Sequence, residues 1–237
     1  MKDLKSLNRV LLKLSGEALA GEKKTGFDEA TVLKVAEQVK KIVDDGMQVA
    51  IVIGGGNFWR GRTSENMERT KADQIGMLAT VMNAIYVADC CRQKGVDAVV
   101  MTPIKIGTVT LEFSKDLANK LLNEGKVIIF AAGIGHPFFS TDTVTALRAC
   151  ELEADAILFA KAIDGVYDSD PATNPNAKKF DEIPCKDIVE KNLKVIDIAA
   201  ANLCYENKIP VVIFGLAEDN GIVKAANGEK IGTVVTV

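Results

Sequence analysis

Short apolar runs alternate with stretches of helical periodicity along most of the chain. Each run is apolar at successive positions, which is typical of strands that are buried on both faces of a parallel sheet. Parallel strands need long crossover connections, and helices usually supply them. The pattern therefore predicts an α/β fold, a three-layer α/β/α sandwich with a mostly parallel central sheet. The predicted strands cover residues 9–14, 49–53, 98–101, 127–131, 156–159, 210–214 and 233–237.

Helices are expected between these strands. Asp28 suits the N-cap of the first long helix, and Gly46 suits its end. Another helix is predicted to follow Asp73, and Thr141 or Asp142 is expected to cap the helix that runs through Cys150. Further helices are predicted at 114–123, 197–204 and 222–226, and the longest loop at 164–179.

Composition excludes several classes of protein. The 29 basic and 32 acidic residues give a net charge of −3, which argues against a broad nucleic-acid-binding face. The N-terminus lacks the pattern of a signal peptide, and the apolar runs fall short of the roughly 20 residues that cross a bilayer. We therefore expect a soluble, cytoplasmic protein with neither nucleic-acid nor membrane partners.

The five cysteines form no CxxC pair, and His136 is the single histidine. These residues cannot supply the usual ligand set of a zinc site. We therefore predict reduced, structural cysteines and no protein-bound metal site.

Glycine-rich turns follow several predicted strands, where ligands bind in open parallel sheets. Glycine allows the backbone to approach an anion closely, so four such turns predict a phosphate-rich ligand. The Walker motif GxxxxGK[ST] does not occur, and Trp59 occupies the place of the third glycine of a dinucleotide-binding GxGxxG. The turns are 15–16, 54–56, 133–135 and 164–165.

Two cations are candidates for contact with phosphate. Lys13 lies near the end of the first strand, where burial is costly unless an anion meets it; alternatively it extends into solvent. Arg60 follows the second turn and could clamp phosphate oxygens, although Arg62 is near enough to do the same. Together these features indicate phosphoryl chemistry.

Three segments resemble the amino acid kinase family: KLSGE at 13–17, GGGN at 54–57 and DGVY at 164–167, followed by Asp170-Pro171. Within that family, four further segments resemble the bacterial UMP kinases. These are RGR at 60–62, DQIGMLATVMNA at 73–84, GHPFFSTD at 135–142 and VIDIAA at 195–200. The segments span nearly the whole chain in the order of the family.

The resemblance implies a single domain, 1–237, with an acceptor lobe at about 1–150 and an ATP lobe at 151–237. It implies transfer of the γ-phosphate of Mg²⁺-bound ATP to UMP, giving UDP and ADP for pyrimidine biosynthesis. The implied ATP site comprises Lys13, Leu14, Ser15, Gly16, Gly56, Arg60, Lys161, Tyr167 and Asp170. The implied UMP site comprises Gly55, Asp73, Ile134, Gly135, His136, Pro137, Phe138, Phe139, Ser140 and Thr141.

Four residues receive catalytic roles on this basis. Lys13 and Arg60 would stabilise charge on the transferring phosphoryl group, while Asp142 and Asp197 would hold these cations or Mg²⁺-bound water in place. Each aspartate could also serve as a helix cap. Asp73 could accept a hydrogen bond from a ribose hydroxyl or cap its helix.

Other positions leave alternatives open. Phe138 and Phe139 suit contact with a base, a contact between subunits or core packing. The apolar stripe of Leu78, Met82 and Ile85 suits the core or a subunit interface. His136, Ile134 and Ala162 depart from the residues usual in the family, which leaves their side-chain contacts with nucleotides open.

The resemblance also implies a homo-oligomer, typically a hexamer, with GTP as an activator near 21–28 and UTP as an inhibitor. Kinases of small carboxylates share the lysine and glycine turns, but we do not expect them to carry both 73–84 and 135–142. A non-catalytic nucleotide-binding protein would be expected to lack the cations. A Rossmann oxidoreductase is contradicted by the broken fingerprint.

Overall fold

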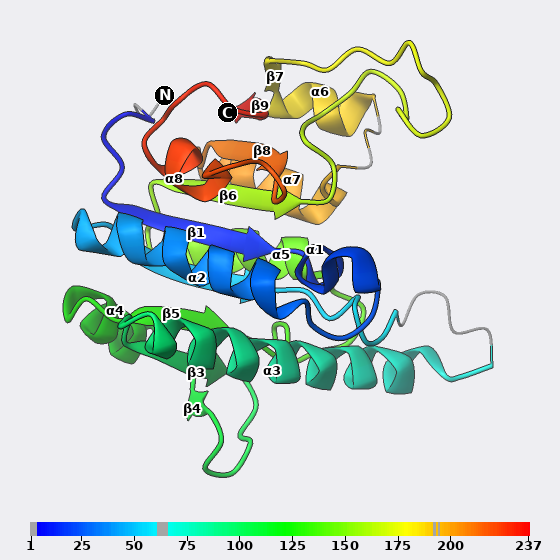
Figure 1. Cartoon of the computed structure of the whole chain (residues 1–237). Helices are drawn as coiled ribbons and strands as arrows, with labels where there is room; N and C mark the ends of the chain where they lie inside the picture. Colours follow the sequence, from blue (N-terminus) through cyan, green and yellow to red (C-terminus); the bar gives the residue numbers. More distant parts are fainter. Residues whose placement is uncertain (1–3, 61–65, 192, 194) are drawn as a thin grey trace.

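A single nine-stranded sheet forms the centre of the computed structural model, which describes residues 4–60, 66–191, 193 and 195–237. Its strand order is β4-β3-β5-β2-β1-β6-β8-β9-β7 (Figure 1). Neighbouring strands run parallel except at the β8–β9 pair. The strands are β1 (Arg9–Leu14), β2 (Gln48–Ile53), β3 (Ala98–Thr102), β4 (Leu111–Glu112), β5 (Val127–Phe130), β6 (Ala156–Lys161), β7 (Glu182–Pro184), β8 (Val211–Gly215) and β9 (Thr233–Thr236). The predicted α/β class with a mostly parallel sheet is confirmed.

Helices cover both faces of the sheet, so the predicted three layers are present. Buried side chains of α1, α2, α3 and α8 form one cluster with one face of the sheet, and those of α4 to α7 form a second cluster on the other face. The helices are α1 (Gly16–Ala20), α2 (Glu29–Asp44), α3 (Arg69–Gln93), α4 (Lys115–Asn123), α5 (Thr141–Glu151), α6 (Cys185–Glu190), α7 (Ile198–Glu206) and α8 (Gly221–Ala226), with a 3₁₀ turn at Gly21–Lys23.

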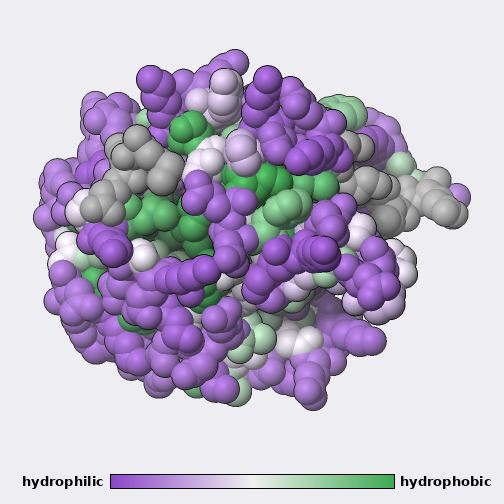
Figure 2. Space-filling view, turned by 90° about the horizontal axis from the view of Figure 1, so that it is seen from above, coloured by the Kyte–Doolittle hydropathy of each residue, from purple (hydrophilic) through white to green (hydrophobic). Residues whose placement is uncertain are grey.

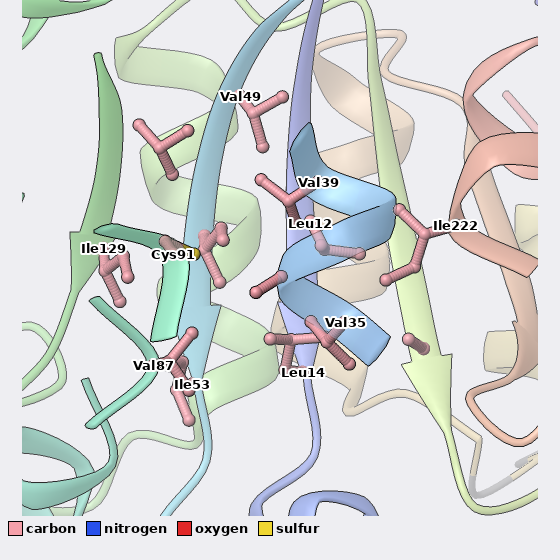
Figure 3. Packing of buried hydrophobic residues seen from close by; sticks show 14 of the residues in the cluster. Leu12, Leu14, Val35, Val39, Val49, Ile53, Val87, Cys91, Ile129 and Ile222 are labelled. Atoms are coloured by element: carbon pink, nitrogen blue, oxygen red, sulfur yellow. The ribbon is translucent and has the colours of Figure 1, made fainter. Parts of the chain in front are cut away.

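In the first cluster, the apolar faces of two helices pack against the sheet. Val35 and Val39 of α2 lie over Leu12 and Leu14 of β1, while Val87 of α3 lies near β2 (Figure 3). All five of these side chains are buried. On the outside, hydrophilic residues cover most of the face seen in Figure 2, with hydrophobic residues gathered in a band near its middle.

Two predicted helix starts are wrong. Helix α3 begins at Arg69 with Glu68 as its N-cap, so Asp73 lies in its second turn and does not cap it. Helix α5 is capped by Ser140, whose hydroxyl accepts hydrogen bonds from the backbone N–H groups of Asp142 and Thr143. Asp28, by contrast, caps α2 as predicted.

Helix α3 meets the length and hydropathy criterion for a membrane span. By length and mean hydropathy it could cross a bilayer, and half of its most apolar stretch is buried within the fold. The core helix of a soluble protein meets the same criterion, so this property alone is weak evidence for a membrane.

The cysteines behave as predicted. All five are free thiols, and four of them are buried. Burial raises the pKa of the Cys91 thiol to about 12, which keeps it protonated and unreactive at neutral pH.

Candidate active site

A cleft of about 710 Å³ opens beyond the carboxyl ends of β1 and β6. The apolar residues Ile188, Val195 and Ile196 contribute to its wall. Eight of the predicted site residues line it: Lys13, Phe138, Phe139, Ser140, Thr141, Asp142, Lys161 and Asp197. The sheet thus brings residues from four separate segments of the chain to one cavity.

Two lysines and one aspartate form the polar centre of this cleft. Lys13 Nζ lies 3.0 Å from Asp142 Oδ1, and Lys161 Nζ lies 3.1 Å from Asp142 Oδ2. The lysines reach the same carboxylate because β1 and β6 are adjacent parallel strands, with Lys13 opposite Phe159. Their side chains are 8% and 15% exposed, and that of Asp142 is 14% exposed.

Two ammonium groups face one carboxylate at this centre. Burial by itself raises the pKa of Asp142, but the ammonium groups of Lys13 and Lys161 outweigh it and hold the pKa below its ordinary value. Burial also lowers the pKa of Lys161, an effect that the Asp142 carboxylate opposes. The lining of the cleft carries a second carboxylate, that of Asp197, so the two lysines and two aspartates balance in charge. An anion is attracted by the position of the two ammonium groups in this sheltered cleft and not by a net charge.

Asp197 joins two helices at the edge of the cleft. Its carboxylate accepts hydrogen bonds from the backbone N–H of Ala200 at 2.8 Å, from Thr143 Oγ1 at 2.9 Å and from Ser140 Oγ. Asp197 therefore caps α7, which confirms the capping interpretation, and it also links that helix to α5. Its predicted catalytic role stays a prediction.

The first two glycine turns lie against each other. A Cβ at Gly16 would come within 2.6 Å of the Gly54 carbonyl oxygen, and a Cβ at Gly55 would come within 2.8 Å of the Gly76 carbonyl oxygen. Glycine is therefore required for close backbone approach at both positions. The buried amides of Asn57 and Asn83 bond to each other at 3.0 and 2.7 Å, and Asn83 also donates to Gly54.

Arg60 is not among the described residues that line the cleft. Its guanidinium Nη2 lies 2.7 Å from Oε1 of Glu17 in the first turn of α1, and its side chain is 60% exposed. The Glu17 carboxylate therefore competes with phosphate for this guanidinium, which carries five N–H donors. The alternative clamp, Arg62, lies outside the described residues.

Asp73 contacts the loop that carries the predicted acceptor residues. Its Oδ2 accepts one hydrogen bond from Arg69 Nε and one from the backbone N–H of Phe138, each at 2.8 Å. Phe138 and Phe139 are 63% and 54% exposed, so the core-packing alternative is wrong for both. Asp73 therefore contacts loop 134–141, which carries both aromatic residues.

The predicted ATP residues beyond Lys161 belong to the 164–180 loop, outside the lining of the cleft. Tyr167 Oη donates to Asp164 Oδ1 at 2.7 Å, and Lys179 Nζ lies 3.0 Å from Asp164 Oδ2. The Asp170 carboxylate accepts from the backbone N–H of Ala172 at 2.9 Å, which closes a local turn.

Sequence reasoning missed several residues of this region. Glu17 and Thr143 received no role because their partners, Arg60 and Asp197, are distant in sequence. Arg69 received none because the helix was expected to start after Asp73, which left no helical pairing between the two residues. Lys161 was expected only at an ATP loop, and its place beside Lys13 depends on strand order. The one available signal was its position at a strand end, the feature that singled out Lys13.

Comparison with known proteins agrees with this geometry. The model of the amino acid kinase family matches residues 8–215. The chain belongs to the amino acid kinase family. Among solved structures, the UMP kinase of Bacillus anthracis is 36% identical, with a TM-score of 0.93 over 97% of this chain and 96% of that one. The UMP kinase of Ureaplasma parvum is also 36% identical, with a TM-score of 0.91 over 98% and 100% of the two chains.

A more distant relative retains the fold. The uridylate kinase of Archaeoglobus fulgidus is 26% identical, with a TM-score of 0.73 over 96% of this chain and 99% of that one. The kinase family and the full-length coverage identify this chain as a phosphotransferase of the amino acid kinase fold.

Proposed function

We propose that this protein is a UMP kinase, which transfers the γ-phosphate of ATP to UMP and releases UDP and ADP. The observation that carries the proposal is the buried Lys13–Asp142–Lys161 centre in a cleft at the carboxyl edge of the sheet. The solved structures that share 36% identity over nearly the whole chain support UMP as the acceptor.

The reaction needs position and positive charge more than acid–base chemistry. The UMP phosphate has a second pKa near 6, so at neutral pH it is largely a dianion and a ready nucleophile. One of its oxygens attacks the γ-phosphorus, the bond from that phosphorus to the bridging oxygen breaks, and ADP takes the electron pair. Lys13 and Lys161 stabilise the charge on the transferring group, and Asp142 holds both ammonium groups in position.

The order of the sheet supports two substrate lobes. Residues 1–150 supply β4, β3, β5, β2 and β1, while 151–237 supply β6, β8, β9 and β7. ATP lies on the second half, at Lys161, Tyr167 and Asp170, and reaches the first through residues 13–16, Gly56 and Arg60. UMP lies at Gly55, Asp73 and 134–141. Mg²⁺ would enter as part of the Mg–ATP substrate. In support, the described residues contain no group of three or more His, Cys, Asp or Glu side chains that could hold a metal ion.

The test is a coupled ADP-release assay with Mg–ATP and a panel of acceptors: UMP, CMP, dUMP, acetylglutamate, aspartate and carbamate. Strong turnover restricted to UMP is expected. Turnover with an amino acid or carbamate instead would contradict the proposal, and folded protein that binds ATP but turns over no acceptor would favour a nucleotide-binding protein.

Replacing Asp73 by asparagine is expected to raise the KM for UMP much more than the KM for ATP. The carboxylate holds the Phe138 backbone and faces the acceptor region, and the amide weakens its bond to Arg69. Steady-state kinetics with each substrate varied in turn measure the effect. Asp89→Asn, on the same helix, serves as an exposed control. Equal changes in both KM values would contradict the assignment.

The assembly is proposed to be a homo-oligomer, of hexameric size as in the family. On α3, Ile75, Leu78, Met82 and Ile85 are 38–53% exposed, and their spacing of three, four and three residues matches the seam of paired helices. A second copy of the chain would cover this stripe. Leu78→Glu is expected to yield a smaller species in sedimentation, while Glu112→Gln should not; an unchanged assembly in Leu78→Glu would exclude the stripe from the interface.

The proposal extends to regulation and location. We infer that GTP activates through residues 21–28 and that UTP inhibits, in a cytoplasmic enzyme. In support, the backbone N–H of Gly26 donates to the Asn57 carbonyl at 3.2 Å, and the Asn57 side-chain amide donates to the Gly26 carbonyl at 2.8 Å. Segment 21–28 is thereby joined to the glycine turn of the phosphate site.

A further inference from the structure

Two residues of the loop that connects β5 to α5 have strained backbone conformations. Ala132 has a φ of 59° and Phe138 a φ of 73°, in the left-handed region that side chains with a Cβ disfavour by about 1–2 kcal/mol. These are the two non-glycine residues with positive φ between β5 and α5. Such conformations persist where the surroundings hold them.

Helix α3 holds both of them. The backbone N–H of Ala132 donates to Thr80 Oγ1 at 2.8 Å, and the backbone N–H of Phe138 donates to Asp73 Oδ2 at 2.8 Å. Positions 73 and 80 are two helical turns apart and lie on one face of α3. The loop is therefore fastened to the same helix face at both of its strained positions.

The hydroxyl of Thr80 has a fixed orientation. It donates to the carbonyl oxygen of Met77 at 2.6 Å, which leaves its lone pairs free to accept from Ala132. Thr80 is 4% exposed, so water cannot readily replace the hydroxyl as a partner for the Ala132 N–H. A buried donor left without an acceptor destabilises its conformation, here the start of the acceptor loop.

We propose that Thr80 is a positioning residue for the phosphate acceptor. It acts through Ala132, because its hydrogen bond to the Ala132 N–H fixes the point at which the loop leaves the sheet. The path of residues 133–139, which form the UMP side of the pocket, follows from that point. This role rests on the proposed function, because it assigns the loop to UMP. Thr80 touches neither substrate, and it differs from Asp73 in that its hydrogen-bond partners among the described residues are both backbone groups.

The test compares two substitutions at the same position. Thr80→Val keeps the size and branching of the side chain but removes the hydroxyl, and Thr80→Ser keeps the hydroxyl. Isothermal titration with UMP and, separately, with ATP is expected to show about tenfold weaker UMP binding in Thr80→Val, with ATP binding changed less than about twofold. Thr80→Ser is expected to bind UMP within about twofold of the parent protein.

Thr233→Val is the matched control. Thr233 is fully buried, and its hydroxyl also bonds to backbone groups, those of Val166 and Phe180, but it lies away from the acceptor loop. It is expected to lose stability comparably and to keep its affinity for UMP. The same UMP affinity in Thr80→Val and Thr233→Val, or equal losses of UMP and ATP binding in Thr80→Val, would overturn the proposal.

Amide hydrogen exchange separates this proposal from the proposed function. Protection of the Ala132 amide is expected to fall in Thr80→Val and to survive in Thr80→Ser, whether or not a ligand is present. Unchanged protection in Thr80→Val would overturn the positioning role. If the parent protein bound no UMP but the exchange result held, the assignment of the loop to UMP would fail while its attachment to α3 stood.

Discussion

Lys13→Ala is expected to lower turnover with Mg–ATP and UMP at least about a hundredfold, the size of effect typical for one preorganised charge at a transition state. The ammonium group lies at the end of β1, 3.0 Å from Asp142, and only 8% of the side chain is exposed. Alanine leaves Asp142 paired with Lys161 alone, so that the two carboxylates of the cleft, Asp142 and Asp197, outnumber its one remaining ammonium group.

The fold should tolerate Lys13→Ala because the backbone of β1 keeps its pairing to β2 and β6. Coupled ADP release measures turnover, and circular dichroism checks the fold. Lys40→Ala, which removes an exposed lysine paired with Asp44 on α2, should stay near normal. Near-normal turnover in a folded Lys13→Ala variant would remove Lys13 from the catalytic centre.

Asp142→Asn is expected to affect both activity and stability. The amide has the same shape but no charge, so Lys13 and Lys161 face each other across a buried site without their shared counterion. Breaking a buried ion pair in this way costs about 3–5 kcal/mol, and turnover should fall about a hundredfold or more because neither ammonium group is held in place.

Denaturant unfolding measures the stability of Asp142→Asn, with Asp187→Asn as a control. Asp187 pairs with Lys191 on the exposed side of α6, where an ion pair contributes about 0–1 kcal/mol. Added inorganic phosphate should restore part of the stability lost in Asp142→Asn by supplying a counterion. Equal small losses in the two variants, or no effect of phosphate, would contradict the shared-counterion account.

The strands could be predicted because burial on both faces makes them apolar at most positions. The elements that were missed, β4, β7, α1 and α6, are too short for any period to be evident; β4 has two residues and β7 three. The start of α3 was misplaced because its first turn, from Arg69, is polar and the apolar stripe begins later, so that Asp73 resembled a cap.

Local sequence could predict part of the candidate site. Lys13 was recognisable from its place beside a strand end, whereas the role of Asp142 came from the resemblance to the family, since a helix start by itself indicates only a cap. The position of Lys161 follows from the β1–β6 pairing, which joins segments far apart in the chain and has no local signature. The pairing of Arg60 with Glu17 likewise follows from the close approach of two turns.

The place of β9 in the sheet has a consequence for synthesis on the ribosome. This strand lies between β8 and β7, and β7 pairs with no other strand among the described residues. It ends at Thr236, about 50 residues after Pro184 at the end of β7. At a synthesis rate of roughly 5–20 residues per second, about 3–10 s pass between the synthesis of β7 and that of its partner strand β9. Nascent chains should therefore keep β7 unpaired, and sensitive to proteases, until β9 emerges.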